Sequence, residues 1–151
     1  MRFCKRPFEN FEMDRSFEIY TCCPNYFKER QVLGSILQDS PENIWNSEAA
    51  QNLRQHIIKG DFSLCNTDRC CIYPTLEDIS EEELKKYSAI CEKNPKYFGL
   101  YYDLVCNAKC TMCRDNFYNN YEEKTEFLNK IAEEKILPLL KDAEILYLNG
   151  S

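Results

Sequence analysis

The sequence has no long apolar run and no basic stripe, and only one of its 151 residues is histidine. No apolar stretch approaches the roughly 20 residues of a membrane-spanning helix, so no membrane association is expected. Lys and Arg are scattered or paired with acidic residues in a chain of net charge −6, which disfavours a nucleic-acid partner. His56, the one histidine, falls on a predicted helix and is expected to be a partly exposed residue rather than a ligand or base.

Ten cysteines are the most unusual feature of the composition. Their density is below that of short secreted disulfide scaffolds, and the first residues, MRFCKRPFENFEMD, lack the apolar core of a signal peptide. These two observations favour a reducing compartment and a soluble, cytoplasmic protein. In such a compartment, clustered cysteines indicate metal binding or catalysis rather than disulfides.

The first part of the chain, residues 1–71, contains a predicted hairpin. FEIYTCC at 17–23 is rich in β-branched and aromatic residues and is predicted to be a strand, paired with the segment 8–13. The residues MDRSFEIY that lead into this strand contain no glycine, so the turn of the hairpin is expected to differ from one that contains glycine.

Two helices are predicted to follow the hairpin. Ser40 before Pro41 is typical of a helix start, and a longer helix is predicted over 47–59 with Gly60 as its stop. Trp45 is interpreted as the aromatic anchor of a small core.

Residues 72–96 are predicted to be a helical connector. Ser80 and Glu83 form a capping-box pattern, and Leu84, Tyr87 and Cys91 would share one face of the helix that follows. Cys91 is therefore expected to be a core residue rather than a ligand.

Residues 97–151 have the pattern of a strand, a helix and a second strand. YFGLYYDLV reads as a buried strand, and EILYLNGS reads as the second strand. Apolar residues between 127 and 140 recur at helical spacing, and Pro138 is expected to kink or split that helix. The connection rule makes this a right-handed βαβ unit. The predicted fold class is α+β: a small cysteine-rich domain followed by an incomplete β/α unit, which is expected to be a truncated piece or to need a partner.

Three cysteines lie just past the first of these strands, in CNAKCTMC. Loops after parallel strands commonly build active sites. Cys106, Cys110 and Cys113 could hold three irons of a [4Fe–4S] cubane and leave the fourth iron open for chemistry, because four cysteines normally close such a cluster. The alternative is zinc, completed by Asp115 or a water molecule.

The stretch LYYDLVCNAKCTMCR resembles the start of a radical S-adenosylmethionine (radical SAM) core. The resemblance implies that Cys106, Cys110 and Cys113 bind a [4Fe–4S] cluster whose open iron chelates S-adenosylmethionine, which is cleaved reductively to a 5′-deoxyadenosyl radical. Met112 replaces the aromatic residue that often precedes the last cysteine in that family. Asn149 and Gly150 stand where the family's glycine-rich motif for the amino group of S-adenosylmethionine begins.

The amino-terminal part resembles a SPASM-type auxiliary-cluster domain, over residues 4 to about 71. The matching features are Cys-x2-Pro-Phe at the start, a strand ending in Cys-Cys-Pro, an Ile-Trp-Asn-Ser helix start and a helix leading to Cys-Asn-x3-Cys. The resemblance implies one [4Fe–4S] cluster held by four cysteines: Cys4, Cys22 or Cys23, Cys65, and Cys70 or Cys71. Consecutive side chains on a strand point to opposite faces, so one member of each doublet is expected to bind, with Cys22 and Cys70 as first choices.

The leading hypothesis divides the chain into an auxiliary [4Fe–4S] domain at 1–71, the connector at 72–96 and the start of a radical SAM core at 97–151. One or two [4Fe–4S] clusters and S-adenosylmethionine are the implied cofactors. The implied partners are a peptide, sugar or other small substrate and an electron donor such as flavodoxin or ferredoxin. Two alternatives stay open: a non-enzymatic iron–sulfur electron-transfer or binding module, and a zinc-stabilised interaction domain.

Overall fold

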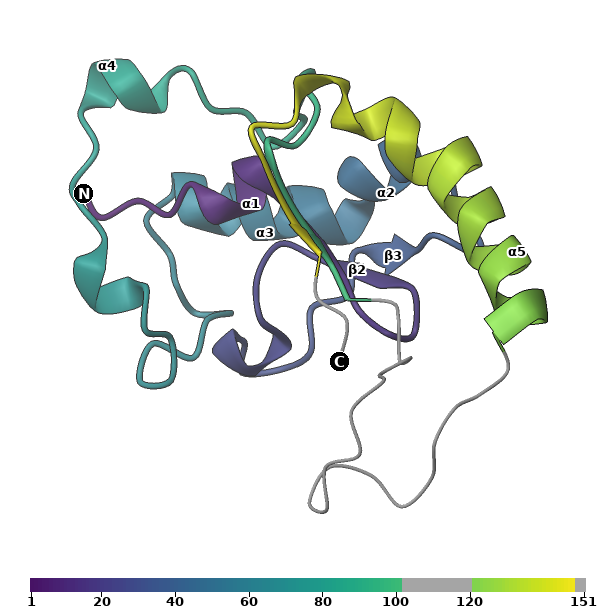
Figure 1. Ribbon diagram of the computed structural model, residues 1–151. Coiled ribbons are helices and arrows are strands. Elements are labelled where there is room, and N and C mark those ends of the chain that lie inside the picture. Colours follow the sequence, from purple (N-terminus) through teal and green to yellow (C-terminus); the bar gives the residue numbers. More distant parts are fainter. Residues whose placement is uncertain (102–120, 149–151) are drawn as a thin grey trace.

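A five-stranded mixed sheet organises the molecule, as shown by a computed structural model that describes residues 1–101 and 121–148 (Figure 1). The strand order is β3-β2-β1-β4-β5. The strands are β1 (Asn10–Met13), β2 (Glu18–Tyr20), β3 (Gly34–Ser35), β4 (Tyr97–Leu100) and β5 (Ile145–Leu148). The first three are paired antiparallel, whereas β1–β4 and β4–β5 are parallel. The α+β fold class predicted from the sequence is confirmed.

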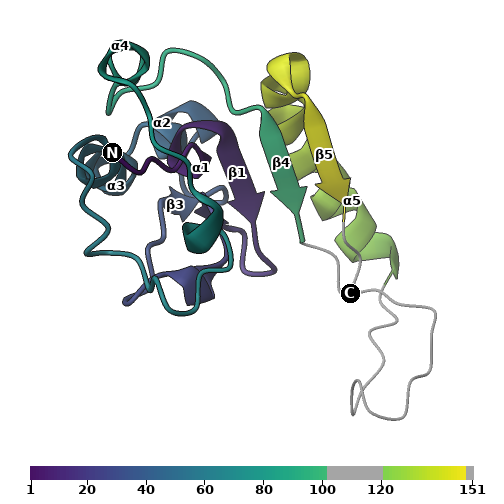
Figure 2. The ribbon, with the colours of Figure 1, turned by 90° about the vertical axis from the view of Figure 1, so that its left-hand side faces the viewer.

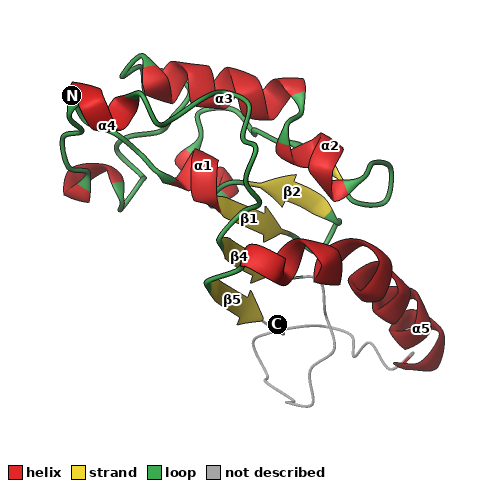
Figure 3. Ribbon diagram, turned by 90° about the horizontal axis from the view of Figure 1, so that it is seen from above, coloured by secondary structure: helices red, strands yellow, loops and turns green. Residues whose placement is uncertain are grey.

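Helices cover one face of this sheet (Figure 3). The helices of the described residues are α1 (Arg6–Glu9), α2 (Pro41–Trp45), α3 (Glu48–Ile58), α4 (Glu81–Leu84) and α5 (Tyr121–Ile131), the last continuing as a π-helix η3 (Ala132–Ile136) and a 3-10 helix η4 (Leu137–Asp142). Two further 3-10 turns are η1 (Pro24–Tyr26) and η2 (Tyr73–Thr75). The core between the layers contains Phe11, Met13, Phe98 and Leu100 from the strands, packed against Ile44, Trp45, Ile131, Ile136 and Leu139.

The predicted amino-terminal hairpin is confirmed, and its turn is made without glycine. Asp14 organises the turn: its carboxylate accepts hydrogen bonds from the backbone N–H groups of Ser16 and Glu18. Phe17 takes the left-handed conformation, with φ +60°, where a glycine would normally stand. Its ring packs edge-on against Phe127 of α5, with ring centroids 5.7 Å apart. The contact with α5 therefore opposes the backbone strain at this position.

Replacing Phe17 by Gly and by Ala is expected to separate these two effects. Both variants lose the contact with Phe127, but only Gly occupies the left-handed region without strain. Phe17→Gly should therefore be more stable than Phe17→Ala by about 1 kcal/mol, measured as the free energy of unfolding in urea. Equal stabilities would show that the turn relaxes when the phenyl ring is removed.

The predicted helix starts are confirmed in detail. The hydroxyl of Ser40 accepts from the backbone N–H of Asn43, and that of Ser47 accepts from Ala50. Gly60, with φ +72°, follows the end of α3 as expected. Trp45 is 3% exposed, which confirms it as a core anchor.

A buried arginine joins three parts of the amino-terminal region. Arg54 of α3 is fully buried, and its guanidinium lies over the Trp45 ring at 4.2 Å from the centroid. It donates to the backbone carbonyls of Pro7 and Ala89 and to the side-chain carbonyl of Asn46. Arg54 thus connects α1, the α2–α3 junction and the connector.

The connector is less helical than predicted. Ser80 caps α4 by accepting from the backbone N–H of Glu83, as expected, but the helix ends at Leu84 and does not extend to Cys91. The Tyr87 ring packs against Phe3 and Phe8, with centroids 4.5 and 5.0 Å away. A helix as short as α4 has little intrinsic stability. The aromatic contact of Tyr87 therefore decides the path of the chain after Leu84, which is a turn.

The predicted strand–helix–strand unit is present in the described residues, with β4 and β5 parallel and α5 beside them (Figure 2). Pro138 lies where α5 has already given way to the π-helix and then the 3-10 helix η4, which confirms the expected splitting of this helix. The part of the first strand beyond residue 101 lies outside the described residues. No helix among the described residues is long and apolar enough to cross a membrane.

The sheet runs through both halves of the chain, a feature that the sequence did not predict. β1 and β4 pair in parallel from Asn10 opposite Tyr97 to Met13 opposite Leu100. The division at residues 71 and 97 stays a prediction, but strands from both sides of it form one sheet.

Candidate metal centre

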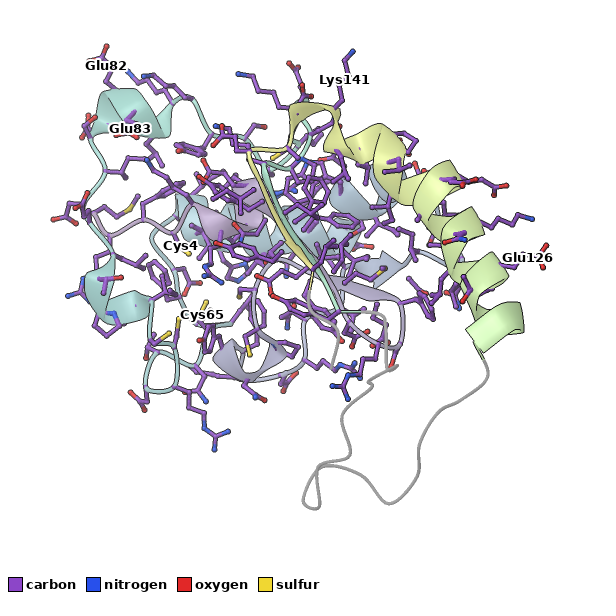
Figure 4. The ribbon with its side chains drawn as sticks, in the orientation of Figure 1. Cys4, Cys65, Glu82, Glu83, Glu126 and Lys141 are labelled. Carbon is purple, nitrogen blue, oxygen red and sulfur yellow. The ribbon has the colours of Figure 1, made fainter. Side chains whose placement is uncertain are left out.

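Four cysteines from three segments of the chain line one small cavity of about 30 Å³. They are Cys4, Cys22, Cys65 and Cys70. The rest of the wall is largely apolar, with Leu53 and Ile57 from α3 and the ring of Phe62. Figure 4 shows Cys4 and Cys65 in the same region of the molecule. The structure therefore brings together one member of each Cys-Cys doublet and the two predicted cysteines that are not part of a doublet, Cys4 and Cys65.

Cys4 and Cys22 are placed by elements of the sheet and its neighbouring helix. Cys4 lies two residues before α1, which has Pro at its second position. The N–H of Phe8 donates to the carbonyl of Lys5 and closes the first turn. Cys22 lies two residues past the end of β2. The doublet is thus beyond the strand, so its two side chains are separated by the bend that leads into η1 and not by strand alternation.

Cys65 and Cys70 are placed by a loop that follows α3. The N–H of Cys65 donates to the carbonyl of Phe62, and Cys65 forms an isolated bridge with Phe27. The N–H of Cys70 donates to the carbonyl of Asn66 at 3.0 Å, closing a turn within Cys-Asn-x3-Cys. The spacing of this motif therefore brings both thiols to the same cavity.

The second members of the doublets lie elsewhere. Cys23 lines an open groove with Glu12, Tyr20 and Tyr101. Cys71 is exposed, and its Sγ is 3.0 Å from the hydroxyl oxygen of Tyr26. This contact is the main reason why the pKa of Tyr26 is raised, to about 12. The geometry agrees with the first choices made from the sequence, while the assignment of ligands stays a prediction.

Burial dominates the electrostatics of the cavity. It raises the pKa of the thiols of Cys4 and Cys22, and it raises that of Cys65 to about 11. Repulsion from neighbouring thiolates adds to this effect: Cys4 raises the pKa of Cys22, Cys70 raises that of Cys4, and both Cys4 and Cys70 raise that of Cys65. The positive charge of Arg6 opposes it at Cys4 and Cys22. Without a metal, the thiols of Cys4, Cys22 and Cys65 are therefore protonated at neutral pH, since the pKa of each is raised.

The stability of the metal-free protein is expected to fall as the pH rises from about 9 to 11. In the unfolded chain Cys65 ionises near 9.0, whereas in the folded chain it ionises near 11, so the unfolded state loses its proton first and gains stability over this interval. Urea unfolding of reduced, metal-free protein at about pH 8 and about pH 10.5 measures the effect. Cys65→Ser is the control, because serine does not ionise there; an identical pH dependence in that variant would contradict the role given to Cys65.

The four thiols suit an iron–sulfur cluster, because such a cluster has several metal atoms that can each bind one thiolate. Among the described residues, no group of three or more His, Cys, Asp or Glu side chains is already arranged to hold a metal ion. Zinc needs its ligands about 2.3 Å from one ion, whereas each thiolate of a [4Fe–4S] cluster binds a different iron. Four thiols around one cavity supply enough ligands for either metal, and the positive charge of Arg6 beside two of them would offset part of the negative charge of a bound thiolate site.

Two residues of the cavity were missed in the sequence. Arg6 and Tyr26 both line it. Arg6 lies two residues after Cys4 and Tyr26 four residues after Cys22, so proximity to the cysteines was the available signal. Side-chain direction, which decides their roles, is not readable from spacing.

The remaining candidates lie outside the cavity or outside the described residues. Cys91 is half-buried and packs against the apolar core, as expected. His56 is 30% exposed on α3, also as expected. The triplet Cys106, Cys110 and Cys113 lies outside the described residues, as do Asn149 and Gly150.

Comparison with known proteins agrees with this reading of the amino-terminal segment. No curated protein and no solved structure matches the chain significantly. Residues 4–71, slightly less than half of the chain, match the family model of SPASM, the iron–sulfur cluster-binding domain. The matched segment contains all four cysteines of the cavity, and iron–sulfur cluster binding is the function that this match supports.

Proposed function

We propose that the chain holds a [4Fe–4S] cluster through Cys4, Cys22, Cys65 and Cys70, and that it is part of a radical SAM–SPASM enzyme. The observation that carries the first half of the proposal is the gathering of four thiols around one cavity within the segment that matches SPASM. The burial of these thiols favours a bound cluster, because metal ions bind thiolates and offset the cost of ionising them.

The second half of the proposal rests on the triplet in CNAKCTMC and its resemblance to the radical SAM core. A cluster held there would supply the electron that cleaves S-adenosylmethionine. Cys106, Cys110 and Cys113 would be its ligands, and Asn149 with Gly150 would contact the amino group of S-adenosylmethionine. The substrate would be a peptide, a sugar or another small molecule, with flavodoxin or ferredoxin as electron donor in the cytoplasm.

A second candidate function, electron transfer alone, is favoured by one feature of the cavity. Cys4 lines both the closed cavity and an open groove of about 500 Å³ bounded by residues 72–79 of the connector. A cluster bound at Cys4 would therefore lie close to the surface. Addition of S-adenosylmethionine and a reductant separates the two functions, since a pure electron carrier forms no 5′-deoxyadenosine.

Metal and sulfide analysis of anaerobically purified protein is the first test. Two [4Fe–4S] clusters give about eight irons per chain with matching sulfide, whereas about four irons mean that only one of the two proposed sites binds a cluster. Stoichiometric zinc without sulfide would instead support a zinc-stabilised interaction domain.

Replacing Cys106, Cys110 and Cys113 by Ala assigns the sites. The variant should lose one cluster and keep the other. If its iron and sulfide content equals that of the parent protein, the triplet is not a cluster site.

A further inference from the structure

In each of the two cysteine doublets, one cysteine lines the cavity and its neighbour does not. The backbone explains this difference for Cys22 and Cys23 but not for Cys70 and Cys71. Cys22 is separated from Cys23 by the bend into η1, and the two line different hollows. Cys70 and Cys71 are adjacent in a loop after the Asn66 turn, where a small local rotation would exchange them. Something else must keep Cys71 out of the cavity.

Tyr26 is placed to do this. Its side chain lines the cavity, and its hydroxyl is 3.0 Å from the Sγ of Cys71 on the exposed side. Its backbone is fixed to both cysteine segments, because its N–H donates to the carbonyl of Cys23 and its carbonyl accepts from the N–H of Asn66 at 2.7 Å. The backbone of Tyr26 is therefore fixed between the doublets, and its phenol reaches Cys71 from there.

We propose that Tyr26 is a positioning residue that selects Cys70 as the cluster ligand by holding Cys71 outward through its hydroxyl. The inference rests on the proposed [4Fe–4S] site. Loss of the hydroxyl frees Cys71, which is next to Cys70 in the chain and has the same ligating atom. Cys71 then becomes available as a substitute ligand.

The test measures iron and acid-labile sulfide in variants that all carry Ala at positions 106, 110 and 113, so that only the amino-terminal site is counted. Each protein is reconstituted anaerobically and desalted with a chelator. Cys70→Ala should lose most of its iron, at least about five-fold, because only three ligands remain while Tyr26 holds Cys71 away. Cys70→Ala/Tyr26→Phe should recover about half of the parent's iron or more, through Cys71.

Three controls make the result specific. Cys71→Ala alone should keep the parent's iron content. Adding Cys71→Ala to Cys70→Ala/Tyr26→Phe should abolish the recovery. Cys70→Ala/Tyr73→Phe, which removes the hydroxyl of another tyrosine lining the cavity, should stay depleted.

The outcomes separate this inference from the proposed function. A parent protein without iron and sulfide contradicts the cluster site itself. If the parent binds a cluster, the role of Tyr26 is overturned either by a Cys70→Ala/Tyr26→Phe variant that stays depleted or by a Cys70→Ala variant that keeps its cluster. Circular dichroism of each metal-free variant shows whether a depleted protein is still folded like its metal-free parent.

Discussion

Cys4→Ala/Cys65→Ala is expected to abolish cluster binding in the amino-terminal region and to unfold that region. Both thiols pack against the smaller apolar cluster, whose buried members among the described residues are Phe3, Phe8 and Ile57. So small a core depends on its metal, and metal sites of this kind contribute on the order of 10 kcal/mol to folding. Iron content, far-UV circular dichroism and the protection of amides in α1 and α3 from hydrogen exchange measure the two effects together.

Cys91→Ala is the matched control for this double variant. Cys91 is half-buried like the other two and packs against the same apolar cluster, but it does not line the cavity. The control should keep its iron and lose at most about 1 kcal/mol of stability. A double variant that stays folded with unchanged iron content would refute the assignment of Cys4 and Cys65.

Arg54→Met is expected to lower the free energy of unfolding by about 3–5 kcal/mol, the second of the two large effects, because each buried acceptor left without a partner costs about 1–3 kcal/mol. Methionine replaces the apolar stem of Arg54 but cannot donate hydrogen bonds. The carbonyls of Pro7 and Ala89 then lose their partner inside the protein, and the contact with the Trp45 ring is weakened. Thermal unfolding should shift down by roughly 10 °C.

Arg30→Met provides the comparison for Arg54. Arg30 also faces a tyrosine ring and pairs with Asp14 and Glu18, but its side chain is 56% exposed. Exposed ion pairs contribute about 1 kcal/mol or less, so this variant should change stability little. If both variants lost a similar free energy of unfolding, the stabilising effect of Arg54 would not depend on its burial.

Local signals in the sequence predicted local structure well. Ser40, Ser47 and Ser80 each accept the capping hydrogen bond that their position before a helix suggested. These predictions succeed because a cap involves residues only three positions apart. The connector helix failed for the opposite reason: the packing of Tyr87 on Phe3 and Phe8 involves residues distant in sequence and overrides the helical pattern.

The candidate site was predictable in composition and only partly in geometry. The motif spacing indicated the cysteines, but the choice between Cys70 and Cys71 depends on where Tyr26 points, and the bend after β2 replaces the strand alternation used to choose Cys22. The buried position of Arg54 could not be predicted from the sequence, because an arginine on a helix is normally exposed. Tertiary contacts decide all three.

The parallel pairing of β1 with β4 can form only late in synthesis on the ribosome, because β4 is far from β1 in the sequence. All four cavity cysteines leave the exit tunnel before Tyr97, so until β4 emerges β1 keeps an unpaired edge next to the apolar side chains of Phe11 and Met13. A fragment that ends near residue 71, where the family match ends, keeps that open edge permanently. Such a fragment should aggregate readily, and supplying residues 97–148 in trans should rescue it.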